Sequence, residues 1–338
     1  MRLVPKKNMG ENQPSSAAQQ SPEIIILGPP SVFRVYEKEF SSRFRVLRPW
    51  ESQVPLPQFL AARAHGTRAA VCSGDFQLSA AVLGNLPSLR LVFTTSAGLN
   101  HIDLTECRRR GIAVAYAGNF FSADVADLAV GLLLDVLRKV SAGNRFVKNR
   151  LWPHPPDSFP LGSKLGGKRV GIVGLGSIGV EVAKRLEAFG CTISYCSRKK
   201  KPLAPYTSYP DIHELASNSD VLVLCCALTE QTRHMINREV MLALGKGGVI
   251  VNIARGAVID EEELVSCLLR GEIAAAGLDV FEHEPCLPPE LCQLDNVVLS
   301  PHAAVFTEES MAGLYQLLCG NLDAFFTDKP LLSQIPDE

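Results

Sequence analysis

A glycine pattern lies between an apolar run and a helical pattern in VGIVGLGSIGVEVAKRL, with glycines in the spacing G-x-G-x-x-G over residues 174–179. In that context the glycines permit a tight turn, a close approach of the backbone to a pyrophosphate, and close packing of helix against strand. The helix N-terminus adds free N–H groups that attract phosphate. The predicted cofactor contacts here are Gly174, Leu175, Gly176, Ser177, Ile178 and Gly179. The alternative is a tight turn that binds nothing.

A basic cluster follows the next apolar run, CTISYC, in the stretch CSRKKKP. This position usually holds an Asp or Glu that bonds the ribose 2′-hydroxyl of NAD. Here Ser197, Arg198 and Lys199 stand instead, and a hydroxyl, a guanidinium and an ammonium all suit a phosphate. The cluster therefore predicts binding of the 2′-phosphate of NADP(H), with NAD(H) as the weaker alternative. A solvated basic turn is the competing interpretation.

Three further stretches place ionisable side chains directly after apolar runs. Arg255 lies in VNIARGAVIDEEEL, Asp279 and Glu284 lie in GLDVFEHEP, and His302 lies in LSPHAAV. Ligands of a doubly wound sheet bind outside the carboxyl ends of its strands. We therefore expect these four side chains to converge where the nicotinamide of a dinucleotide lies.

The elements that must position these residues alternate between short β-rich runs and helical patterns. Near-continuous Val, Ile and Leu in the runs is typical of parallel strands covered on both faces. The sequence predicts an α/β protein of two domains: a Rossmann-like doubly wound parallel sheet for the cofactor, and a discontinuous flavodoxin-like substrate domain. Helices are predicted over 123–140 and 308–326, and we expect the latter to return to the first domain.

The predicted boundaries are 1–21 for a disordered tail, 22–123 and 304–338 for the substrate-binding domain, and 124–303 for the dinucleotide-binding domain. The length of 338 residues suits two domains.

Composition excludes several classes of function. A formal net charge of −1 gives no reason to expect nucleic acid as a partner. No apolar run approaches the ~18 residues that a membrane helix needs. The ten cysteines are scattered without a CxxC pair, so we expect free thiols and no metal site. A polar N-terminus without a secretory pattern favours the cytoplasm, with a plastid as the alternative.

A family resemblance rests on the motifs in combination. They are SAGLNHID (96–103), NFFSADVAD (119–127), GLGSIG, the LT-x-x-T element (228–232), N-x-ARG (252–256), GLDVFEHEP and SPH. With them, residues 23–327 resemble the D-isomer-specific 2-hydroxyacid dehydrogenases, and look closest to the plant glyoxylate/hydroxypyruvate reductases and the related hydroxyphenylpyruvate reductases.

The resemblance implies a role for each matching residue. Arg255 is similar to the arginine that binds the substrate carboxylate and carbonyl, and His302 to the proton donor. Glu284 is similar to the carboxylate that pairs with this histidine, while Glu282 is a rival disfavoured by its spacing from Arg255. Asp279 is similar to the aspartate that meets the nicotinamide carboxamide.

Further contacts are implied in the same way. The substrate carboxylate is expected on the loop Ala97, Gly98 and Leu99, and the remaining cofactor contacts are Thr229, Thr232, Ile253, Ala254 and Ala304. Two departures stand out: Ala227 replaces a frequent proline, and Asn100 a frequent aspartate. The other six histidines, at 65, 101, 154, 213, 234 and 283, are expected to be surface or loop residues.

The implied function is reduction of a small 2-oxo acid, hydroxypyruvate or glyoxylate, to the D-2-hydroxy acid. One alternative is a bulkier substrate such as 4-hydroxyphenylpyruvate, with Phe120, Phe121 and Trp152 as candidate lining, core or interface residues. The other is a dinucleotide-sensing protein resembling transcriptional corepressors, which keep the Arg/Glu/His set. The resemblance also implies a homodimer, with 123–165 as a plausible interface, and hinge closure between the domains.

Overall fold

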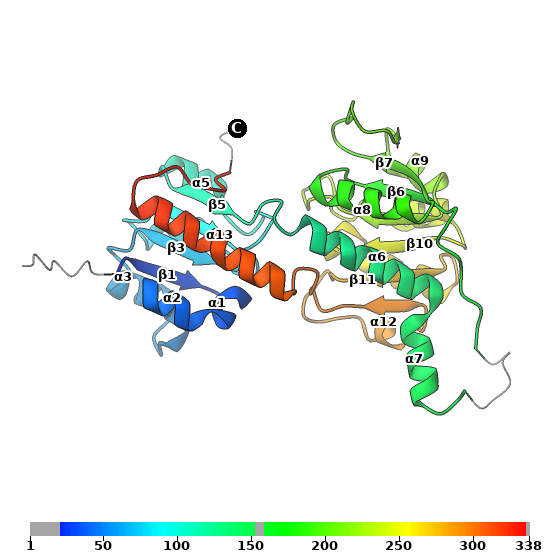
Figure 1. Cartoon of the computed structure of the whole chain (residues 1–338), viewed down its shortest axis with the longest axis horizontal. Helices are drawn as coiled ribbons and strands as arrows, with labels where there is room; N and C mark the ends of the chain where they lie inside the picture. The colour runs from blue at the N-terminus through cyan, green and yellow to red at the C-terminus, as the bar shows by residue number, and fades with distance from the viewer. Residues whose placement is uncertain (1–20, 153–158, 336–338) are drawn as a thin grey trace, which may run out of the picture.

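Two separate parallel β-sheets organise the chain, one in each half of the molecule (Figure 1). The structure is a computed structural model that describes residues 21–152 and 159–335. All but the last residue of the predicted tail 1–21, and His154, lie outside the described residues. The two-sheet α/β architecture confirms the predicted fold class.

The first sheet has five strands in the order β2-β1-β3-β4-β5, which is the flavodoxin-like order. The strands are β1 (Glu23–Leu27), β2 (Arg45–Leu47), β3 (Ala69–Cys72), β4 (Leu91–Thr94) and β5 (Ala113–Tyr116). Its helices are α1 (Ser31–Val35), α2 (Glu37–Arg43), α3 (Leu56–Arg63), α4 (Ala80–Gly84) and α5 (Leu104–Arg109). Every residue of β3 and β4 is buried, because the sheet is covered on both faces.

The second sheet has seven strands in the order β12-β11-β10-β9-β6-β7-β8. They are β6 (Arg169–Val173), β7 (Thr192–Cys196), β8 (Thr207–Ser208), β9 (Val221–Leu224), β10 (Val249–Asn252), β11 (Ala275–Leu278) and β12 (Val297–Leu299). The order reverses between β6 and β9, and a ligand crevice of a doubly wound sheet opens at such a point.

Helices cover both faces of this second sheet. They are α8 (Ser177–Ala188), α9 (Ile212–Ser217), α10 (Arg238–Leu244), α11 (Glu261–Leu269) and α12 (Pro289–Gln293). Alternate residues of one strand enter different cores: Val249 and Val251 pack in the cluster that includes α8, and Ile250 packs in the cluster that includes α10 and α11. None of the helices in the described ranges is long and apolar enough to cross a membrane.

Two segments connect the halves (Figure 1). Helix α6 (Ser122–Arg138) runs from β5 to the second sheet, where it packs against α8 and β11. Helix α13 (Glu308–Phe326) packs beside α1 and β4 of the first sheet. Thr307, the N-cap of α13, donates from Oγ1 to Asp124 Oδ1 at 2.7 Å. This hydrogen bond ties the two crossings together.

Some element boundaries differ from those expected. The helix predicted over 123–140 ends at Arg138, because Lys139 adopts a left-handed conformation at φ 56°. A second helix, α7 (Val140–Lys148), follows and projects from the body of the second half (Figure 1). The short strands β2 and β8 were not expected, since strands of three and two residues give little periodic pattern.

Candidate active site

The glycine loop joins β6 to the N-terminus of α8, and each of its glycines answers a different steric demand. Gly174 has φ 94°, and an added Cβ would lie 2.8 Å from the Cys226 Cα. An added Cβ on Gly179 would meet the Gly174 carbonyl oxygen and the Ile172 side chain. Space is open beside Gly176, the N-cap residue of α8. The loop therefore fits a phosphate that approaches the backbone at Gly176.

The basic turn after β7 is anchored at both ends. The Leu175 N–H of the glycine loop donates to Ser197 Oγ at 2.7 Å, and the Lys201 N–H donates to the Tyr195 hydroxyl at 2.9 Å. Arg198 and Lys199 are exposed, and within the described ranges neither forms an ion pair. Ser197 thus joins the phosphate loop to two free cations, and its own hydroxyl hydrogen remains available to a ligand.

Four more of the predicted cofactor residues follow β9 and β10. Thr229 donates its backbone N–H to Thr232 Oγ1 at 2.7 Å, and that hydroxyl donates to the Ala227 carbonyl at 2.7 Å. The LT-x-x-T element therefore closes into a local turn although alanine replaces the frequent proline. Ile253 and Ala254 are buried directly after β10.

His302 and Glu284 form a pair at the carboxyl end of the second sheet. Glu284 Oε2 lies 2.8 Å from His302 Nδ1, and Glu284 Oε1 accepts from the Phe281 N–H at 2.9 Å. The hydrogen bond that Glu284 accepts raises the pKa of His302 despite burial, and the charge of Glu284 adds to this effect. Burial raises the pKa of Glu284, but the His302 hydrogen bond and charge leave that pKa lowered overall. Since Nδ1 is engaged, Nε2 is the nitrogen free to exchange a proton.

Asp279 holds the turn that carries His302. Its side chain is 1% exposed, and it accepts from the Ala303 N–H at 2.8 Å and from the Ala304 N–H at 3.1 Å. The His302 N–H donates to the Asp279 backbone carbonyl at 2.8 Å. His302 itself has φ 51°, a conformation that needs such support. In this conformation the Asp279 carboxylate accepts hydrogen bonds from the backbone, a contact that was not predicted.

Arg255 reaches from the second half of the chain to the first. It follows β10, donates from Nη1 to the Ala254 carbonyl at 2.7 Å, and lies so close to Gly98 that an added Cβ there would collide with Nη2. Burial lowers the pKa of Arg255, whereas the charges of Glu284 and Asp75 raise it. A guanidinium remains charged under these conditions. Arg255 therefore contacts the loop 96–100 and is also near enough to the His302–Glu284 pair for their charges to interact.

The loop of Ala97, Gly98 and Leu99 follows β4. The Gly98 N–H donates to Ser96 Oγ at 3.1 Å, and the Ser96 N–H donates to Thr94 Oγ1 at 3.3 Å. The Gly98 N–H, which was expected to bind the substrate carboxylate, thus forms a hydrogen bond within its own loop. Among the described residues no acceptor is recorded for the N–H groups of Ala97 and Leu99, which leaves these two to bind an anion.

His101 corrects the expectation of a surface or loop histidine. Its side chain is 3% exposed, and Nε2 lies 2.9 Å from Thr94 Oγ1 beneath the loop. Burial, and then the charge of Arg255, lower the pKa of His101 to about 4. A partner in β4 was not visible from the sequence, because the contact depends on how the loop folds back. His234 is also engaged, with Nε2 2.7 Å from Glu282 Oε1.

The rival acid has other partners, and the aromatic candidates lie in the core or at the surface. Glu282 pairs with His234 and Arg233, not with His302. Phe121 is a core residue at 3% exposure, Phe120 packs against Phe121 and the Gly313 backbone, and Trp152 is 71% exposed just beyond α7.

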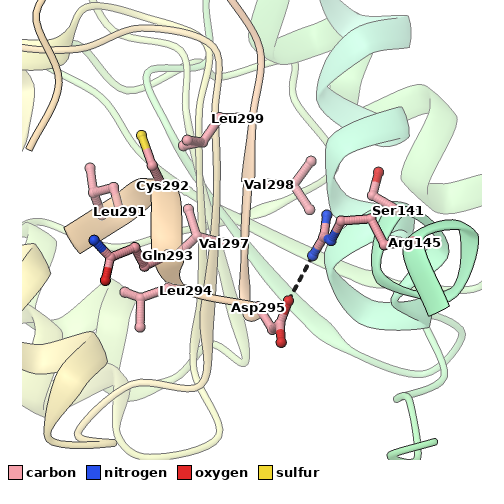
Figure 2. A pocket seen from close by; sticks show the side chains of 10 residues that line it. All are labelled: Ser141, Arg145, Leu291, Cys292, Gln293, Leu294, Asp295, Val297, Val298 and Leu299. Atoms are coloured by element: carbon pink, nitrogen blue, oxygen red, sulfur yellow. Dashed lines mark hydrogen bonds and ion pairs between the residues drawn. The ribbon is translucent and has the colours of Figure 1, made fainter. Parts of the chain in front are cut away.

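A cavity of about 290 Å³ lies between α7 and the segment 291–299, as Figure 2 shows. An ion pair between Arg145 and Asp295, at 2.8 Å, stands at its edge. None of the predicted site residues lines this cavity, so it is separate from the site built around Arg255 and His302.

Comparison with known proteins agrees with this geometry. Residues 130–304 match the family described as D-isomer specific 2-hydroxyacid dehydrogenase, NAD binding domain. A glyoxylate/hydroxypyruvate reductase of Arabidopsis thaliana is 52% identical over 320 residues, which cover 94% of this chain and 99% of the relative. The chain belongs to the D-isomer specific 2-hydroxyacid dehydrogenase family. It is accordingly an oxidoreductase.

Two further similar proteins have related names. A hydroxyphenylpyruvate reductase of Plectranthus scutellarioides is 45% identical over 312 residues, covering 92% of this chain and 98% of the relative. A crystal structure of an NADPH-dependent glyoxylate/hydroxypyruvate reductase from Sinorhizobium meliloti, in complex with NADP and malonate, superposes with a TM-score of 0.85 at 31% identity. The match covers 94% of this chain and 97% of that one.

Proposed function

We propose that this dehydrogenase reduces hydroxypyruvate and glyoxylate to D-glycerate and glycolate, with NADPH as the preferred reductant. The observation that carries the proposal is the 2.8 Å pair of His302 and Glu284, which Arg255 joins to the loop 96–100. The glyoxylate/hydroxypyruvate reductase at 52% identity supports the same substrate class.

The residues act on a 2-oxo acid as follows. Arg255 and the free N–H groups of Ala97 and Leu99 bind the substrate carboxylate and fix its orientation. A nicotinamide cofactor held by the glycine loop would supply the hydride that C2 of the substrate accepts. His302, kept protonated by Glu284, gives its Nε2 proton to the carbonyl oxygen as negative charge develops there.

The residues at the other end of the site support binding of NADP(H). The glycine loop and the N-terminus of α8 suit the pyrophosphate, and the exposed Arg198 and Lys199 beside Ser197 suit a 2′-phosphate. The NADP complex of the Sinorhizobium meliloti enzyme is consistent with this preference. NAD(H) remains the weaker alternative.

The experiment compares initial rates of hydroxypyruvate and glyoxylate reduction with NADPH and NADH at matched concentrations. We expect the higher kcat/KM with NADPH, and Arg198→Asp should narrow or reverse that difference. Lys246→Asp, an exposed lysine in the turn before β10, is the matched control and should preserve the preference. Equal rates with NADH would make the basic cluster a solvated turn.

The same assays separate the alternative functions. A kcat/KM for 4-hydroxyphenylpyruvate above that for hydroxypyruvate would favour the aromatic substrate. Cofactor binding without turnover of any 2-oxo acid would favour the dinucleotide-sensing protein.

We assign residues 124–303 to a cofactor-binding domain, and residues 22–123 with 304–338 to a substrate-binding domain. We expect the two domains to close on the ligands by hinge motion at the two crossings, near Asp124 and after His302. The match of residues 130–304 to the NAD binding domain supports this division. Unchanged small-angle scattering on adding NADPH and oxalate would count against closure.

We further propose a homodimer in the cytoplasm. The projecting helix α7 and the residues after it expose Val140, Val147, Leu151 and Trp152 at 59%, 50%, 41% and 71%, and such an apolar surface favours burial against a second copy. Light scattering that gives the mass of a monomer would contradict the dimer.

A further inference from the structure

A carboxylate that the proposed reaction does not use stands beside the substrate loop. Asp75 is the exposed residue of the half-buried turn Ser73–Phe76, which follows β3. A hydrogen bond closes the turn, because the Phe76 N–H donates to the Ser73 carbonyl at 3.3 Å. Because β3 and β4 are parallel neighbours, this turn and the loop 96–100 emerge at the same edge of the sheet.

Contacts connect this turn to Arg255. The Thr95 N–H donates to the Cys72 carbonyl at 3.0 Å, and an added Cβ on Gly74 would lie 3.1 Å from Ser96 Oγ. Ser96 Oγ accepts from Gly98, which lies under the Arg255 guanidinium. Asp75 is close enough that its charge acts on both Arg255 and His101.

The charges around the bound substrate are then nearly balanced. Arg255 and protonated His302 contribute two positive charges, while Glu284, Asp75 and one substrate carboxylate contribute three negative charges. A second substrate carboxylate would add a fourth negative charge next to Asp75. His101 offers no compensation, because its pKa of about 4 keeps the ring neutral at neutral pH.

We propose that Asp75 is a specificity-determining residue that excludes 2-oxo dicarboxylates from the site by charge repulsion. The site accordingly accepts 2-oxo monocarboxylates whose C2 carbonyl bears a neutral group, such as the hydroxymethyl of hydroxypyruvate or the hydrogen of glyoxylate. This inference deepens the proposed reductase function and rests on it.

The test measures kcat/KM of the full-length enzyme with NADPH for oxaloacetate, 2-oxobutanoate, hydroxypyruvate and glyoxylate. Oxaloacetate and 2-oxobutanoate have the same chain length but differ in the charge at C4. In Asp75→Asn the kcat/KM for oxaloacetate, divided by that for 2-oxobutanoate, should rise by roughly tenfold. This is the effect expected of one partly screened charge. Added salt should raise the same ratio in the wild-type enzyme and much less in the variant.

Glu262→Gln is the matched control, because Glu262 is an exposed carboxylate on α11, and it should leave every ratio unchanged. An unchanged ratio in Asp75→Asn would overturn the inference. A lower kcat/KM for hydroxypyruvate relative to glyoxylate, without a higher kcat/KM for oxaloacetate, would also overturn it. Asp75 would then bind the substrate hydroxyl. A wild-type enzyme that reduces none of the four acids contradicts the proposed function instead, so the two failures are distinguishable.

Discussion

Replacing Glu284 with glutamine removes the charge that keeps His302 protonated and retains an oxygen that accepts a hydrogen bond. The wild-type carboxylate lies 2.8 Å from His302 Nδ1 and raises the pKa of that ring. Reduction requires protonated His302, so its rate falls as pH rises through this pKa. In Glu284→Gln the pKa is lower, and the fall in rate should occur at lower pH.

The size of the effect follows from the geometry of the pair. Two unit charges ~4 Å apart attract by about 4 kcal/mol at an effective dielectric constant of ~20. The His302 and Glu284 side chains are 41% and 32% exposed, so solvent screening reduces this value to ~1–2 kcal/mol. That free energy corresponds to a loss of roughly tenfold in kcat/KM for reduction above neutral pH.

The assay records kcat/KM for hydroxypyruvate reduction from acid to alkaline pH, together with oxidation of D-glycerate. Oxidation requires the unprotonated ring, so the Gln variant should begin to oxidise at lower pH than the wild type. Glu282→Gln is the matched control, because Glu282 pairs with His234, and its pH profile should not move. A uniform fall in rate with an unmoved profile in Glu284→Gln would refute the role assigned to the pair.

Three further predictions concern the surrounding contacts. Gly98→Ala should raise KM for the 2-oxo acid by about tenfold or more, because the new Cβ displaces the Arg255 guanidinium; an unchanged KM would contradict the contact. Asp279→Asn should lower the free energy of unfolding by roughly 2 kcal/mol in a denaturant titration, because the buried carboxylate accepts hydrogen bonds from two backbone N–H groups. It should also lower kcat. A variant as stable as the wild type would contradict this role of Asp279. Thr307→Val removes the 2.7 Å hydrogen bond to Asp124 and the N-cap hydrogen bond of α13. It should lower Tm by ~2–4 °C. A thermal melt identical to that of the wild type would contradict this prediction.

The functional stretches differ in how far sequence alone could specify them. The demand on Gly179 is local, because its close neighbours belong to the same strand–turn–helix unit, whereas an added Cβ on Gly174 would meet Cys226 after β9. The cysteines, scattered in the sequence, are free thiols in the structure. The end of α6 was predicted at residue 140, two residues beyond its last residue Arg138, because the apolar periodicity continues across the turn into α7.

The sequence by itself determined the α/β class, the glycine loop, the basic turn and the candidacy of Arg255, Glu284 and His302, because each depends on residues close together in the chain. Only the tertiary structure decided which long-range contacts form. The Thr307–Asp124 bond joins residues 183 positions apart, and Arg255 meets Gly98 across two different sheets. Such contacts depend on the relative placement of whole sheets, which is fixed by packing and leaves no periodic signal in the sequence.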